Sequence, residues 1–254
     1  YLILLPGCAN LQFGPYISPI QIFNMQTLLI RNARLVNRGR IYSGDILIRR
    51  GYIEKIAGAI AEKADFETDA GGHHVIPGII DDQVHFREPG LTHKANIYTE
   101  ARAAVAGGVT SFMEMPNTIP ASLTEELLEQ KYAIAAQNAL SNYSFFMGVS
   151  NDNAHEAIRV SQTRKNDVCG LKIFMGSSTG NMLVDNRDVL SKVFSESELL
   201  IATHCEDEAR IRARVAQYTE EFGDKLTAFD VILEVFFNTA SDHIIKSRKI
   251  IMYA

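Results

Sequence analysis

The apolar residues follow one rhythm before Pro77 and another after it. Between Thr27 and Asp69, short apolar runs are separated by glycine turns, a pattern that predicts a small antiparallel β unit. One small sheet cannot bury both of its faces, so we expect this unit to pack on another part of the protein.

After Pro77 strand-like and helix-like segments alternate. Strands are predicted over 75–86, 109–115, 143–149, 168–175 and 199–204, and helices over 96–106, 123–140, 153–160, 186–194 and 207–222. Alternation at this spacing predicts βα units and a parallel sheet.

Five βα units are compatible with a doubly wound sheet or with a shortened (β/α)8 barrel. No G-x-G-x-x-G follows the first strand, which removes the best dinucleotide signal. Polar residues stand at the strand ends instead, where barrel enzymes build their sites: His85, Arg87, Asn117, Lys172 and His204. We therefore expect an α/β fold, a partial TIM-type (β/α)8 barrel over 75–227, with a small N-terminal β-sandwich portion over 25–74.

The two ends differ from the middle. Residues 1–24 form an atypical extension before the first methionine, Met25, and we interpret them as upstream sequence ahead of the true start. A lipoprotein-type cleavage before Cys8 is the less favoured interpretation, because the preceding apolar run is short and has no basic residue before it. Residues 228–254 form a divergent tail without a turn or a polar end.

Composition narrows the class of protein. The 254 residues are 46% hydrophobic and 22% charged, which is typical of a globular protein. A net charge of −5 without a basic block argues against a nucleic-acid partner. Three scattered cysteines favour a reducing cytoplasm, and no apolar run reaches the ~18–20 residues of a membrane span.

The first strand after Pro77 carries the first candidate chemistry. Because alternate strand residues share a face, Asp81, Gln83, His85 and Arg87 are predicted to point the same way. Such polar groups are costly to bury without partners, so they predict the floor of a site. The alternative is a strand end that faces solvent and satisfies its polar groups there.

Two later strands add a lysine and a second histidine. Lys172 lies in a buried strand, where it needs either a carboxylate partner, for instance Glu114 or Asp81, or a neutral amine. A neutral amine can take up carbon dioxide and become a carbamate that bridges two cations. His204 is the second strand-end histidine, and neutral imidazole is a common zinc ligand.

Two further candidate functional features, a phosphate-binding loop and a thiol nucleophile, are less favoured. The loop Gly176–Asn181 could cradle a phosphate through its backbone, but it lacks the Gly-Lys-Ser/Thr of a P-loop, and we interpret it as a loop beside the site. Cys205 next to His204 suggests a thiol nucleophile, but neighbouring strand residues face opposite sides.

With these residues in place, the chain resembles the dihydroorotases of the amidohydrolase superfamily from about Met25 to Thr227. Four segments in family order carry the resemblance: Asp81 to Gly90 (DDQVHFREPG), Glu114 to Thr118 (EMPNT), Leu171 to Met175 (LKIFM) and His204 to Asp207 (HCED).

The resemblance implies a zinc-dependent hydrolase that interconverts N-carbamoyl-L-aspartate and L-dihydroorotate in pyrimidine synthesis. It implies that His85, Lys172 as a carboxylated lysine, and His204 are metal ligands. It implies that Arg87 and Asn117 hold the carboxylate of this small-molecule substrate, in keeping with the donor geometry of both side chains.

The chain also departs from the family pattern. Gln83 stands where the family has the first histidine of His-x-His, and an amide oxygen binds zinc poorly. The family's later metal histidine and its catalytic aspartate would lie on strands beyond this chain. We therefore hypothesise a truncated or frame-shifted product that is poorly folded and inactive alone.

Two alternative functions stay open. A dihydropyrimidinase or allantoinase is less favoured, because those relatives have less need for Arg87 and Asn117. A catalytically silent partner that scaffolds another pyrimidine enzyme is favoured by Gln83. A homodimer is also compatible with the sequence.

Overall fold

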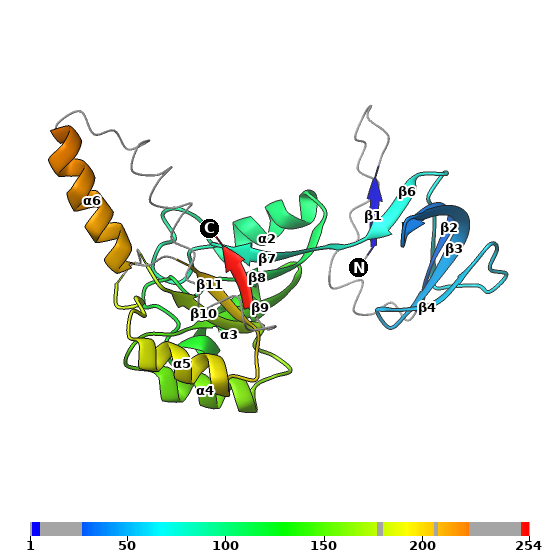
Figure 1. The fold of residues 1–254 in the computed structure, drawn as a ribbon. Coiled ribbons are helices and arrows are strands. Elements are labelled where there is room, and N and C mark those ends of the chain that lie inside the picture. Colours follow the sequence, from blue (N-terminus) through cyan, green and yellow to red (C-terminus); the bar gives the residue numbers. More distant parts are fainter. Residues whose placement is uncertain (1, 6–26, 177–179, 206–207, 224–249, 254) are drawn as a thin grey trace. The chain divides into compact units, whose positions relative to one another are not determined.

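The computed structural model describes residues 2–5, 27–176, 180–205, 208–223 and 250–253 (Figure 1). The chain divides into two compact units, residues 1–80 with 105–110, and residues 81–104 with 111–254. Most of the predicted extension 1–24 and tail 228–254 lies outside the described residues, as does the centre of the loop 176–181.

The first unit is a six-stranded mixed sheet. Its strands run in the order β1-β6-β2-β3-β4, and β5 also pairs with β2. The strand bounds are β1 Leu2–Leu5, β2 Thr27–Asn37, β3 Arg40–Arg49, β4 Tyr52–Ala57, β5 Phe66–Asp69 and β6 His74–Pro77. The predicted antiparallel unit is correct for β2, β3 and β4. It is wrong for β5, which pairs with β2 in parallel, because the β3–β4 hairpin acts as the crossover that parallel pairing requires. β6, which follows the predicted unit, also pairs with β2 in parallel.

Both hairpins of this unit turn through residues with positive φ. Arg38 and Gly39 join β2 to β3 with φ of 49° and 71°, and Arg50 and Gly51 join β3 to β4 with 51° and 82°. Paired left-handed residues match the twist of the flanking strands, so these two-residue turns fix the register of the hairpins.

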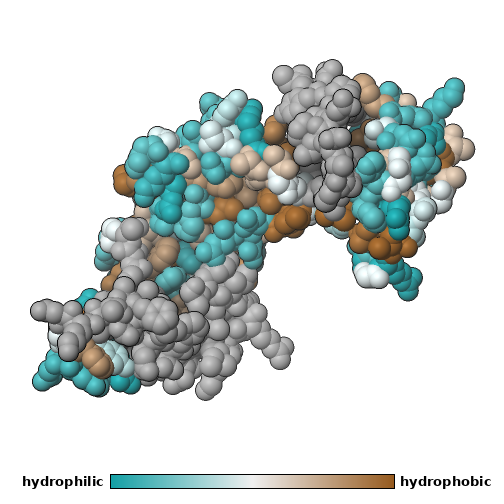
Figure 2. Space-filling view, turned by 90° about the horizontal axis from the view of Figure 1, so that it is seen from above, coloured by the Kyte–Doolittle hydropathy of each residue, from teal (hydrophilic) through white to brown (hydrophobic). Residues whose placement is uncertain are grey.

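Apolar side chains fill both faces of this sheet. Ile30, Leu35 and Ile46 belong to one buried cluster, and Leu29 and Leu47 belong to another. Neighbouring strand residues thus face opposite sides, and the irregularity in β2 between Ile30 and Ala33 brings Leu35 to the side of Ile30. Large apolar residues on β3 and β4 remain exposed, among them Ile41 at 57% and Tyr52 at 79%. Figure 2 shows apolar surface of this kind, in brown, among hydrophilic side chains.

The second sheet contains six strands in the order β12-β11-β10-β9-β8-β7, and the pairs from β8 to β12 are parallel. The strand bounds are β7 Ile79–Val84, β8 Val109–Glu114, β9 Asn142–Gly148, β10 Gly170–Phe174, β11 Ile201–His204 and β12 Ile250–Tyr253. The predicted five strands are thus joined by a sixth, β12, from within the segment that the sequence marks as a divergent tail.

The single strand predicted over 75–86 is wrong, because the structure divides it between the two sheets. β6 ends at Pro77 and β7 begins at Ile79. Proline has no N–H for a ladder, and a Cβ on Gly78 would lie 2.1 Å from the Thr110 hydroxyl oxygen. The chain therefore changes sheets at Pro77-Gly78.

Five helices follow the predicted positions closely: α2 Ile97–Ala106, α3 Glu125–Asn138, α4 Ala154–Thr163, α5 Arg187–Glu196 and α6 Glu208–Phe222. Thr124 is the N-cap of α3, since its side chain accepts a hydrogen bond from Leu127 N. Asn186 caps α5 in the same way by accepting from Asp188 N. No helix in the described ranges is long and apolar enough to cross a membrane.

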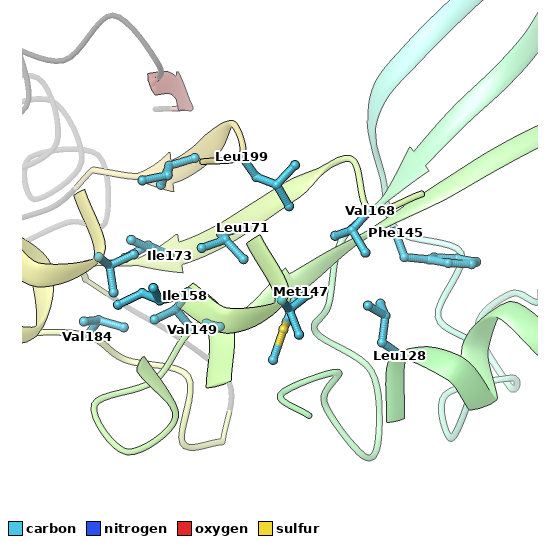
Figure 3. Packing of buried hydrophobic residues seen from close by; sticks show 14 of the residues in the cluster. Leu128, Phe145, Met147, Val149, Ile158, Val168, Leu171, Ile173, Val184 and Leu199 are labelled. Carbon is cyan, nitrogen blue, oxygen red and sulfur yellow. The ribbon is translucent and has the colours of Figure 1, made fainter. Parts of the chain in front are cut away.

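Helices α2, α3, α4 and α5 pack on one face of the parallel sheet. Their apolar residues form one buried cluster with strand residues, and Figure 3 shows Leu128 and Ile158 from the helices near Phe145, Met147 and Leu171 from the strands. A doubly wound fold would place helices on both faces. The one-sided arrangement confirms the predicted partial barrel, whose other face carries a separate cluster with Met115, Phe146 and Ala202.

Candidate active site

The exits of β7 and β8 meet through their polar side chains. His85 follows β7, and its Nδ1 lies 2.8 Å from the side-chain oxygen of Asn117, which follows β8. An amide oxygen can only accept, so Nδ1 carries the proton and Nε2 keeps its lone pair. A partner on one ring nitrogen is the usual arrangement for a histidine that binds metal through the other.

The surroundings of His85 favour the neutral imidazole. Burial lowers its pKa most, and the positive charge of Arg87 lowers that pKa further. The hydrogen bond that His85 donates to Asn117 raises the pKa in part, while the charges of Lys172 and Lys131 lower it. A neutral ring is what a metal ligand requires.

Arg87 adopts a conformation that strand alternation does not predict. Its φ is +70°, so the chain has left the extended conformation after Val84. Its N–H donates to the Glu114 carboxylate at 3.1 Å, and its carbonyl accepts from Leu91 N at 3.0 Å. The direction of the Arg87 side chain is therefore set by this turn.

The loops after β7 and β8 are packed against each other. Ile119 N donates to the Pro89 carbonyl at 3.1 Å, and a Cβ on Gly90 would lie 2.0 Å from the Ile119 carbonyl oxygen. Only glycine permits this approach, so the loop with Asn117 is held beside the loop with Arg87.

Lys172 lies in the middle of β10, on the face opposite the helices. Its backbone is in register with Ala202 of the second cluster, and the residue is only 2% exposed. Burial lowers the pKa of its amine to about 8, and the neighbouring Cys205 opposes that shift. Its Nζ lies 4.9 Å from the centre of the Phe174 ring.

The predicted alternative in which Lys172 pairs with Glu114 is wrong. Glu114 points to the helix-covered face, where its Oε2 lies 3.1 Å from Nζ of Lys131 on α3. Phe112 and Glu114 share that face by strand alternation, and Phe112 belongs to the core beneath the helices. The carboxylate is therefore engaged away from Lys172.

His204 ends β11 beside the same aromatic ring. It is in register with Phe174, and the two ring centres are 6.1 Å apart. Lys172 and His204 thus both neighbour Phe174 on one face of the sheet. Cys205 has its sulfur 2.6 Å from the Thr203 hydroxyl, and burial raises the pKa of its thiol, which opposes its use as a nucleophile.

Few side chains that could bind a metal come together at these strand ends. Within the described part of the chain, no three His, Cys, Asp or Glu side chains come together as a metal site. A metal held by His85 and His204 would need a further ligand, and Lys172 could not provide one as an ammonium. The residues fit zinc if Lys172 is carboxylated, because the carbamate supplies the missing anionic oxygen.

Sequence reasoning missed the buried ion pair of Glu114 and Lys131. Both side chains are 0% exposed. The signal was present in α3, where the buried positions are Leu128, Lys131 and Ala135. A lysine at this helical spacing lies on the apolar stripe and predicts a buried carboxylate partner.

A parallel sheet with helices on one face and polar residues at its carboxyl edge is the arrangement of part of a TIM-type barrel, the class of fold in which enzymes build their sites at that edge. The model of the dihydro-orotase-like family matches residues 72–226. The chain belongs to this family.

The relatives agree with this assignment. The chain is 34% identical to a dihydroorotase of Methanosarcina acetivorans over 72% of its length, and 33% identical to an allantoinase of Deinococcus radiodurans over 70%. These matches cover 39% and 40% of the two relatives. Among solved structures, L-hydantoinase from Arthrobacter aurescens matches with a TM-score of 0.69 and 27% identity, over 77% of this chain and 44% of that one. The chain thus spans about two fifths of the curated relatives it matches.

Proposed function

We propose that this chain forms part of a zinc-dependent cyclic amide hydrolase, a dihydroorotase that interconverts N-carbamoyl-L-aspartate and L-dihydroorotate in pyrimidine biosynthesis. The observation that carries the proposal is the buried amine of Lys172 with its lowered pKa, on a sheet edge that also carries His85 and His204. The dihydroorotase relatives support the choice of reaction class.

Lys172 has the chemistry to become a metal ligand. With a pKa of about 8, roughly a tenth of its amine is neutral at pH 7. The neutral nitrogen attacks carbon dioxide, a carbamate forms, and one proton leaves to solvent. His85 and His204 would supply imidazole nitrogens to a bound zinc ion. Bound zinc would polarise the ring amide of the substrate and lower the pKa of a water molecule.

Arg87 and Asn117 are the proposed partners of the substrate carboxylate. The Arg87 guanidinium offers a planar pair of N–H donors. The Asn117 oxygen is engaged with His85, so its NH2 group is the part that turns toward substrate. Asn117 in this arrangement orients the metal ligand and the substrate together.

The test is zinc binding and substrate binding by the 254-residue chain. We expect one or two equivalents of zinc, and we expect Arg87→Ala to abolish dihydroorotate binding while zinc remains. Unchanged dihydroorotate binding in Arg87→Ala would remove the carboxylate argument. A stable fold that binds no zinc would instead favour the silent partner of another pyrimidine enzyme, the reading that Gln83 supports.

A dihydropyrimidinase or allantoinase activity is the second enzymatic candidate. The allantoinase relative and the L-hydantoinase structure favour it. Turnover of allantoin or dihydrouracil without turnover of dihydroorotate would establish it, because neither substrate carries a ring carboxylate for Arg87. A cytoplasmic location, with a homodimer or a pyrimidine-pathway enzyme as partner, completes the proposal.

A further inference from the structure

The buried ion pair of Glu114 and Lys131 connects three elements around the candidate site. Glu114 ends β8, and Lys131 lies in α3. The Lys131 amine also donates to the Met115 carbonyl at 2.9 Å. Burying two charges is costly, and a well-packed apolar pair often gives equal or greater stability. The pair therefore needs an explanation other than stability.

The two oxygens of Glu114 face different partners. Oε2 faces the Lys131 amine at 3.1 Å, and Oε1 accepts the N–H of Arg87 at 3.1 Å. The N–H of Phe86 also stabilises the carboxylate. Glu114 thus binds the backbone N–H groups of Phe86 and Arg87, at the point where the chain enters the left-handed conformation of Arg87.

A closed set of contacts results between the exits of β7 and β8. Met115 N donates to the Val84 carbonyl at 3.0 Å, so Met115 is bonded to β7 through its N–H and to Lys131 through its carbonyl. His85 lies between Val84 and Phe86, within this clamped segment. Its ring is then bonded to Asn117, three residues beyond Glu114.

We propose that Glu114 and Lys131 are positioning residues: the carboxylate, anchored by the lysine, fixes the backbone of Phe86 and Arg87 and so directs the His85 ring and the Arg87 side chain. Both side chains are fully buried, so they act through the backbone and not on a substrate directly. The consequence for metal affinity rests on the proposed function, whereas the consequence for the backbone and the His85 ring does not.

Two double variants separate positioning from stability. Both remove the ion pair, but only Glu114→Gln/Lys131→Met keeps a side-chain oxygen that can accept the Arg87 N–H. Glu114→Leu/Lys131→Met replaces the pair by apolar side chains of similar size and has no acceptor. The first double variant is the matched control for the second.

The first measurement uses metal-free protein. Amide exchange of Arg87 and the ring-nitrogen shifts of His85 are followed by NMR, with Ile173 in β10 as an internal reference. In the Leu/Met variant we expect Arg87 exchange to accelerate about tenfold or more and the His85 ring to lose its single tautomer. In the Gln/Met variant we expect both signals to stay close to those of the unmodified chain.

The second measurement is zinc titration of the same proteins. We expect affinity to fall about 10- to 100-fold in the Leu/Met variant and to change little in the Gln/Met variant. If the unmodified chain binds no zinc, the proposed function fails, and the NMR comparison still decides the positioning role.

Equal behaviour of the two double variants would overturn the inference. If the Leu/Met variant fails to fold, amide exchange in the unmodified chain is the test. The Arg87 amide lies beyond β7, so slow exchange of this amide is expected only if it is bonded to Glu114. Rapid exchange of that amide in the folded, unmodified chain would equally overturn the proposal.

Discussion

Replacing Lys172 by methionine should stabilise this protein at neutral pH. The two side chains have similar length, but methionine has no charge to bury. Burial lowers the pKa of the Lys172 amine from its ordinary value near 10.5 to about 8. The folded state therefore holds the proton less tightly than the unfolded state.

The size of the effect follows from this difference. A shift of 2.5 pH units corresponds to about 3 kcal/mol of stability lost below pH 8, where both states are protonated. Between pH 8 and 10.5 the unfolded chain binds the proton and the folded chain does not, so the free energy of unfolding rises with pH. By pH 9.5 about 1.4 kcal/mol of the penalty remains, and above pH 10.5 it disappears.

The measurement is urea unfolding followed by circular dichroism, with chelator present and carbon dioxide removed so that the amine stays unmodified. Lys172→Met should exceed the unmodified chain by up to about 3 kcal/mol at pH 7, and by less at pH 9.5. The control is Lys165→Met, since Lys165 forms an exposed ion pair with Glu198 and should change stability by about 1 kcal/mol or less. A less stable Lys172→Met protein at pH 7, or a difference independent of pH, would refute the reasoning.

Three further predictions concern the second unit. Leu171→Ala, which removes a fully buried side chain from the core beneath the helices, should cost about 2–5 kcal/mol, measured as a fall in the urea midpoint; a loss below about 1 kcal/mol would contradict the packing. Thr124→Ala should cost about 1 kcal/mol by removing the cap of α3, whereas Thr124→Ser should restore it. Burial raises the pKa of the Cys169 thiol to about 12, so iodoacetamide at pH 8 should modify it only after unfolding, as peptide mass spectrometry would show.

The sequence pattern was sufficient to predict those structural features that depend on neighbouring residues. The helices α2 to α6 follow from apolar periodicity, and the cap of α3 by Thr124 depends on residues within one helical turn. Strand order along the chain also placed Lys172 in β10 and His204 at the carboxyl end of β11. Each of these features depends on residues close together in the sequence.

Which groups pair with the buried charged side chains depended on the tertiary structure. The sequence suggested Glu114 as a partner for Lys172. In the structure Phe112 and Glu114 face the helices, and Glu114 pairs with Lys131 on the buried side of α3. In the same way Asn117 was expected to hold substrate, and the structure bonds its oxygen to His85. Tertiary packing decides which face of the sheet contacts a given helix, and the local sequence pattern does not predict this.

The sequence by itself determined the alternation of strands and helices and the chemistry available at the strand ends, because propensity and periodicity act over a few residues. Only the tertiary structure decided that the helices cover a single face, that β12 pairs with β11, and that Glu114 engages the Arg87 backbone. These outcomes join segments far apart in the chain, and their free energy comes from burial and hydrogen bonding that exist only once those segments meet.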